Sequence, residues 1–174
     1  LIGADVVLET PSGPKKMIYA DYVASGRALR QVETFVMDEV LPYYANSHTE
    51  QSLCGARMTR MREEARAIIA NHCDANIDEH AVIFGGSGAT TGINQAIHLF
   101  GIHDAIAAGQ AVYVFIGPYE HHSNLLPWRE SGATLVEIKE AQDGGVDLND
   151  LETKLLQYFG KGMLIGAFSA ASNV

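Results

Sequence analysis

Residues 111–138, AVYVFIGPYEHHSNLLPWRESGATLVEI, consist of two apolar segments with a more polar segment between them. The first apolar segment, residues 111–116, is a nearly continuous run of the kind found in strands that are buried on both faces of a sheet. Residues 122–130 suit a helix, and residues 134–138 suit a second strand. A strand, a helix and a strand in succession form a βαβ unit with parallel strands. This stretch therefore predicts a parallel α/β fold.

The same alternation continues on both sides of the βαβ unit. Upstream, the apolar residues 81–84 predict a strand, and residues 90–100 show helical spacing that Gly101 closes. Downstream, residues 148–159 predict a helix and residues 163–169 predict a fourth strand. We therefore expect a three-layer α/β domain whose largely parallel, mixed sheet is covered by helices on both faces.

The N-terminal third of the chain has a different pattern. Residues 11–14, PSGP, predict a turn between two short extended segments. The spacing of apolar residues predicts a helix over residues 29–40, and the charge-rich residues 55–70 predict another helix with a solvated face. We divide the chain into an N-terminal segment with its helix, residues 1–54, and a single α/β unit, residues 55–174.

The composition limits the classes of function. The 174 residues include 12 basic and 21 acidic side chains, so the formal net charge is −9. Such a surface repels phosphate backbones and anionic lipids, and we expect no nucleic-acid partner and no membrane partner. No apolar run approaches the roughly 20 residues of a spanning helix, and no leader-like segment opens the chain. Cys54 and Cys73 lack metal-ligand spacing and are expected to be free thiols, which favours a cytoplasmic protein.

A glycine-rich segment, GGSGATTGIN at residues 85–94, follows the first predicted strand. Its spacing is not that of a dinucleotide-binding GxGxxG, and no lysine completes a GxxxxGK[ST] phosphate loop. A helix that begins near Ala89 and Thr90 still offers unpaired backbone N–H groups, a positive dipole end and a hydroxyl, which together suit a phosphate monoester. The same residues also fit a tight turn in which Thr90 only caps the helix.

Two adjacent histidines, His121 and His122, follow the strand predicted at residues 111–116. Adjacent side chains point apart, and Glu120 completes no recognisable zinc spacing with them, so we expect no metal. His121 follows a strand end on the same sheet edge as the glycine-rich segment, where parallel α/β sheets bind ligands. Its flat ring is placed to lie on a planar ligand, whereas His122 fits an ordinary surface histidine.

The order of motifs along the chain resembles that of the class V aminotransferase and cysteine desulfurase family. The shared motifs are GSGATTGIN, PYEHHSNLLPW, GATLVEI, GGVDLNDLE and FSAASNV, with IYADYVASG and YYANSHTEQS nearer the start. The histidine motif with its trailing asparagine and Pro-Trp is fairly specific, whereas the glycine-rich segment alone is not. The resemblance implies the aspartate-aminotransferase fold, with residues 55–174 as the N-terminal part of the large domain that binds pyridoxal 5'-phosphate.

The resemblance also implies roles for particular residues. Gly88, Ala89 and Thr90 would hold the cofactor phosphate through backbone amides and a hydroxyl. His121 would stack on the pyridine ring and assist proton transfer as the catalytic residue, and Asn173 would hydrogen-bond the phenolic oxygen. The implied substrate is a small amino acid, and the implied assembly is a homodimer.

Two departures from the family pattern affect these expectations. Where the family has Asp-Asn-Ala-Ala-Thr-Thr, this chain has DYVASG at residues 21–26, so Tyr22 and Gly26 alter the substrate side of the pocket. The family's ring-nitrogen aspartate, Schiff-base lysine and small C-terminal domain all lie beyond the position of Val174. We therefore expect the chain to be an N-terminal fragment that is inactive by itself.

Two other hypotheses concern the same residues. The chain is alternatively a non-catalytic, self-associating α/β module, because an open edge strand invites pairing with another chain. A zinc hydrolase built on His121 and His122 ranks below both the enzyme fragment and the module.

Overall fold

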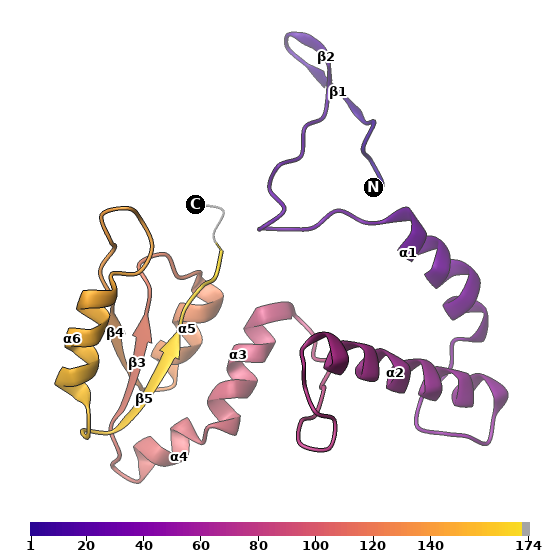
Figure 1. The fold of residues 1–174 in the computed structure, drawn as a ribbon. Helices are drawn as coiled ribbons and strands as arrows, with labels where there is room; N and C mark the ends of the chain where they lie inside the picture. The colour runs from indigo at the N-terminus through magenta and orange to yellow at the C-terminus, as the bar shows by residue number, and fades with distance from the viewer. Residues whose placement is uncertain (172–174) are drawn as a thin grey trace. The chain divides into compact units, whose positions relative to one another are not determined.

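The computed structural model describes residues 1–171 and divides the chain into two compact units, Leu1–Phe84 and Gly85–Val174. Figure 1 follows the helices and strands of both units along the chain. The boundary between the units along the chain differs from the expected division between residues 54 and 55. That expectation concerns the organisation of the whole protein and stays a prediction.

The second unit is built on a parallel sheet. Strands β3 (Val112–Ile116), β4 (Thr134–Glu137) and β5 (Met163–Ala167) lie in the order β4-β3-β5, and both neighbouring pairs are parallel. Val114 of the central strand lies opposite Leu135 on one side and Ile165 on the other. All three strands coincide with segments predicted from their apolar runs, so the parallel α/β class is confirmed.

Helices cover both faces of this sheet (Figure 1). They are α3 (Gly88–Leu99), α4 (Ile102–Ala107), α5 (His122–Glu130) and α6 (Leu148–Tyr158). Along β3 the side chains alternate between two hydrophobic clusters. One face packs on α3, α4 and α5, and its buried members are Val112, Val114, Ile116, Ile97, Ile102 and Trp128. The other face includes Phe115 and packs against Leu151 and Tyr158 of α6.

This alternation explains why the central strand has no polar position. Val114 is fully buried and Phe115 is 1% exposed, on opposite faces of the sheet. Burial of each such side chain contributes about 1.5–3 kcal/mol. The three-layer arrangement follows from a strand that needs apolar partners on both sides.

The prediction of a strand at residues 81–84 is wrong. The structure leaves this segment without regular secondary structure and pairs it with no other strand among residues 1–171. Ile83 is 67% exposed and Phe84 is 51% exposed. An apolar run indicates burial, but a strand forms only where a neighbouring strand satisfies its backbone groups.

Helix α4 was not predicted, because its six residues span fewer than two turns and give no periodic signal. Gly101, which was expected to close the preceding helix, lies between α3 and α4 with a left-handed φ of 64°. A glycine tolerates this conformation without strain, so the chain ends one helix and starts the next at once.

The first unit contains a hairpin and helices. Strands β1 (Val7–Thr10) and β2 (Gly13–Lys16) pair antiparallel around the predicted turn. The helix expected over residues 29–40 is present as α1 (Arg30–Phe35) followed by a π-helical segment, η1 (Val36–Val40). A short 3-10 helix, η2 (Leu41–Tyr43), contains Pro42. The charged helix is α2 (Leu53–His72), slightly longer than predicted.

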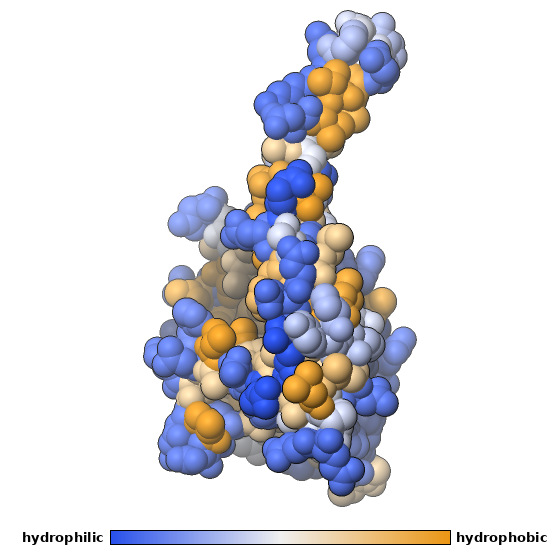
Figure 2. Space-filling view, turned by 90° about the vertical axis from the view of Figure 1, so that its right-hand side faces the viewer, coloured by the Kyte–Doolittle hydropathy of each residue, from blue (hydrophilic) through white to orange (hydrophobic). Residues whose placement is uncertain are grey.

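The first unit buries little apolar surface. Ala70 is the one buried hydrophobic residue that the described part of this unit contains. Leu53 and Ile68 of α2 are 77% and 57% exposed. Figure 2 likewise shows hydrophobic residues interspersed with hydrophilic ones over the face that it presents. The helices of this unit are therefore not held by a packed core of their own.

Candidate functional site

Helix α3 starts inside the glycine-rich segment. Ser87 and Gly88 have left-handed φ values of 58° and 61°, which turn the chain into the first helical turn. Within the described residues no side chain caps this helix start, so its first backbone N–H groups remain available to a ligand. A Cβ added at Gly86 or Gly88 would meet no atom within 4 Å, which leaves room beside the backbone.

Thr90 lies in the first turn of α3 but does not cap it. Its hydroxyl donates a hydrogen bond of 2.9 Å to the Oγ of Ser123. The interpretation in which Thr90 serves only as a helix cap is therefore wrong. The hydroxyl instead faces the start of another helix, α5.

His121 occupies the N-cap position of α5. Its Nδ1 accepts a hydrogen bond of 3.1 Å from the backbone N–H of Ser123 and lies 3.1 Å from the Ser123 Oγ. The histidine itself is exposed. Because Ser123 contacts both Thr90 and His121, two of the predicted site residues lie at one place in the second unit.

Glu120 joins the loop after β3 to the segment after β5. Its carboxylate accepts hydrogen bonds from the backbone N–H groups of Gly117 (3.2 Å) and Ser169 (2.9 Å). It also accepts from the Ser169 hydroxyl (2.7 Å) and the Asn124 amide (2.6 Å). Burial raises the pKa of Glu120, but these hydrogen bonds outweigh burial and hold the pKa below its ordinary value. Glu120 is thus a charged group that fixes the sheet edge.

Asn124 extends this network into the core. Its amide nitrogen also donates to the Ala167 carbonyl at 3.1 Å, and its amide oxygen accepts from the Trp128 indole at 3.1 Å. Ala167 ends β5, and Trp128 is 3% exposed. The network therefore holds the first turn of α5, and with it His121, against the sheet.

Two more residues shape the loop after β3. A Cβ at Gly117 would lie 2.9 Å from the Glu120 carboxylate, so a glycine permits the close approach of that side chain. A hydrogen bond to Glu140 raises the pKa of the Tyr119 phenol above its ordinary value.

The structure brings most of the predicted site together. Gly88, Ala89 and Thr90 form the first turn of α3, and Ser123 joins Thr90 to His121. Asn173 lies outside the described residues. Ser123 was missed by sequence reasoning. Its position two residues after an N-cap is a signal for the backbone bond to His121, but no local pattern indicates its contact with Thr90, 33 residues away.

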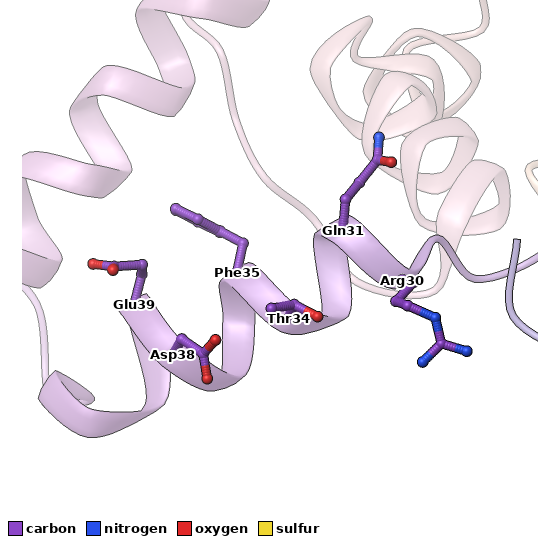
Figure 3. A pocket seen from close by; sticks show the side chains of 6 residues that line it. All are labelled: Arg30, Gln31, Thr34, Phe35, Asp38 and Glu39. Atoms are coloured by element: carbon purple, nitrogen blue, oxygen red, sulfur yellow. The ribbon is translucent and has the colours of Figure 1, made fainter.

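Two surface cavities are lined by residues other than Thr90, Ser123 and His121. Figure 3 shows a shallow pocket of about 570 Å³ whose six lining side chains all project from one helical segment, residues 30–39. None of the predicted site residues lines it. A smaller cavity of about 200 Å³ lies beside the end of β3 and includes Gly117, Glu120 and Arg129.

Residues 1–171 contain no group of three or more His, Cys, Asp and Glu side chains arranged to hold a metal ion. Over the same residues, no helix combines the length and the apolar character needed to cross a membrane.

Parallel α/β sheets bind ligands at the carboxyl ends of their strands. His121, which follows β3, and the start of α3, which Ser123 joins to it, lie at that edge. Residues 18–174 match the family model described as Aminotransferase class-V. The chain therefore belongs to the class-V aminotransferase family.

Several relatives of the chain carry cysteine desulfurase names. A probable cysteine desulfurase of Pyrococcus abyssi is 30% identical over 165 residues, covering 91% of this chain and 38% of the relative. One of Pseudomonas aeruginosa is 31% identical, with coverage of 84% and 36%. A cysteine desulfurase of Enterobacter sp. is 30% identical, with coverage of 80% and 34%. The chain thus spans between a third and two fifths of these relatives. No solved structure matches it.

Proposed function

We propose that this chain forms the pyridoxal-phosphate-binding part of an enzyme of the cysteine desulfurase type, which acts on a small amino acid. The observation that carries this proposal is the hydrogen-bonded series Thr90–Ser123–His121, which brings the helix start and the histidine ring together. Membership of the class-V aminotransferase family and the names of the relatives support the choice of cofactor and reaction class.

The donor groups at the helix start fit a phosphate monoester. The backbone N–H groups of Gly88 and Ala89 begin a helix of 12 residues, and the Thr90 hydroxyl lies in the same turn. The space beside Gly86 and Gly88 admits a ligand close to the backbone. A dianionic phosphate is stabilised there by hydrogen bonds and by the positive end of the helix dipole.

The histidine fits the planar part of the cofactor. His121 is exposed, and the bonds from Ser123 fix its Nδ1, so the ring is oriented before a ligand arrives. Pyridoxal phosphate, when bound, supplies an electron sink for carbanion chemistry. In this proposal His121 covers the cofactor ring and holds or moves a proton at Nε2, while Glu120 and Asn124 keep the helix that carries it in place.

The remaining parts of the proposal concern the whole protein. Of the five lysines in the chain, Lys139 and Lys154 are paired with Asp150 at 3.8 Å and 2.7 Å, and none matches the family's lysine motif. We therefore place the lysine that anchors the cofactor outside residues 1–174, which would leave these residues inactive by themselves. A homodimeric assembly and a cytoplasmic location complete the proposal.

Cofactor retention tests the proposed roles. In the full-length protein we expect Thr90→Ala and His121→Ala each to weaken pyridoxal phosphate binding by about tenfold, since each removes a direct contact. Titration of the apoprotein, followed by cofactor absorbance, measures the dissociation constants. Thr153→Ala is the matched control for Thr90→Ala, because the Thr153 hydroxyl bonds to the Asn149 carbonyl within α6.

Unchanged affinity for pyridoxal phosphate in both variants would contradict the roles assigned to Thr90 and His121. Failure of the unaltered full-length protein to bind pyridoxal phosphate would reject the proposed function itself. Concentration-dependent association in that case would favour the self-associating module, whose opportunity for pairing lies at the outer strands β4 and β5.

A further inference from the structure

Ser123 contacts both residues to which the proposed function gives direct roles. Its hydroxyl oxygen lies 2.9 Å from the Thr90 Oγ1 and 3.1 Å from the His121 Nδ1. Its backbone N–H lies 3.1 Å from the same nitrogen. A single residue thus bridges the start of α3 and the N-cap of α5.

The chemistry of the groups fixes the direction of these hydrogen bonds. A backbone N–H only donates, so the Nδ1 of His121 presents a lone pair to Ser123 and carries no proton. The Ser123 hydroxyl lies at hydrogen-bond distance from the same Nδ1, so it donates to the lone pair that the backbone N–H also uses, and its oxygen accepts the proton of Thr90. In the neutral form of the imidazole, the proton therefore lies on Nε2.

We propose that Ser123 is a positioning residue that relays the state of the Thr90 hydroxyl to the His121 ring. The Thr90 hydroxyl has one proton and can donate one hydrogen bond. If it donates to a phosphate, it no longer donates to Ser123. The Ser123 hydroxyl then loses the polarising donor that strengthens its own bond to Nδ1. Occupancy at the start of α3 is thereby coupled to the proton-holding ring of His121.

The significance of the relay rests on the proposed function, but its hydrogen bonds exist without the cofactor. This allows a test in the full-length apoprotein labelled with 15N-histidine. The readout is the Nδ1 chemical shift of His121 in the unaltered protein and in Thr90→Val, Ser123→Ala and the double variant. A purely structural role of Ser123 would not transmit a change at Thr90 to this nitrogen.

We expect Thr90→Val to move the His121 Nδ1 shift when Ser123 is present and to leave it unmoved in the Ser123→Ala background. Ser123→Thr keeps a hydroxyl and should preserve the response, and Thr153→Val is the control for a threonine-to-valine change elsewhere. An equal response to Thr90→Val in both backgrounds, no response in either, or a proton on Nδ1 would overturn the relay.

Cofactor affinity gives a second readout. Ser123→Ala should lower the affinity for pyridoxal phosphate by about fivefold, the effect of one hydrogen bond. In the double variant with Thr90→Val, the loss should be smaller than the product of the two single losses, since coupled residues are not additive. A loss equal to that product would reject the coupling. If the chemical shifts are coupled but the protein binds no pyridoxal phosphate, the relay stands and the proposed function is rejected. If the protein binds pyridoxal phosphate but the shifts are not coupled, the proposed function stands and the relay is rejected.

Discussion

At the scale of single residues, Glu120 shows how a charged side chain can support a candidate site through hydrogen bonds within the protein. Its carboxylate is the common acceptor for donors from the loop after β3, from α5 and from the segment after β5. These donors favour the ionised form, so the folded protein binds a proton at Glu120 less readily than the unfolded chain does. The stability that Glu120 contributes must therefore depend on pH.

Glu120→Gln should destabilise the second unit by about 1–2 kcal/mol at neutral pH, because a glutamine nitrogen cannot accept from Asn124 or from the Ser169 hydroxyl. The folded-state pKa is lowered, so the contribution is present above the ordinary glutamate pKa of about 4.3 and is lost as the pH falls from there through the folded-state pKa. Urea unfolding at several pH values measures it. The stability curves of the two proteins should converge at low pH. Curves that stay parallel would contradict the prediction, and Glu130→Gln at the end of α5 is the control.

The residues that sequence reasoning found differ from those it missed in the range of their contacts. Thr90 and His121 stand in recognisable motifs, and the local pattern was sufficient to propose both. The partners of Glu120 and Thr90 are Ser169 and Ser123, which lie 49 and 33 residues away along the chain. Such contacts depend on how strands and helices are placed, and no linear motif encodes them.

At the scale of elements, periodicity predicted those parts of the second unit that pack against one another. Strands β3, β4 and β5 and helices α3, α5 and α6 each carry apolar residues that meet a partner across the sheet. Residues 81–84 carry the same kind of apolar run but pair with no strand among the described residues. Sequence therefore indicates which segments prefer burial, while pairing decides which of them become strands.

Asn124→Ala tests the element contact between α5 and β5. The change removes hydrogen bonds to Glu120 and to the Ala167 carbonyl and leaves the buried Trp128 indole without its acceptor. We expect a loss of about 2–3 kcal/mol, since each hydrogen bond contributes roughly 1 kcal/mol and an orphaned buried donor costs more. Trp128 is the single tryptophan, so its fluorescence during urea unfolding measures this unit directly. Asn149→Ala at the exposed start of α6 is the control, and a similar loss in both variants would contradict the role of Asn124.

At the scale of the whole molecule, the two units differ in how their secondary structure is stabilised. The second unit closes two hydrophobic clusters around β3. In the first unit, α2 is fixed at its start by the Ser52 cap and by Arg57, which stacks on Tyr43 at 4.0 Å and donates to Glu39 at 2.8 Å. Polar contacts of this kind contribute little compared with core burial. Unequal local stability should follow.

Hydrogen exchange of the 174-residue chain measures this difference. We expect the amides of β3 to exchange on the order of a hundredfold or more slowly than those of α2, because opening β3 disrupts both clusters, whereas α2 buries only Gly55 and Ala70. Isotope uptake of peptides from residues 53–72 and 112–116, followed by mass spectrometry, gives the comparison within one sample. Val114→Ala should accelerate exchange in β3 and leave α2 unchanged, since Val114 lies in a cluster formed entirely by the second unit. Equal protection of the two segments would show that the first unit has stability from a source other than core burial.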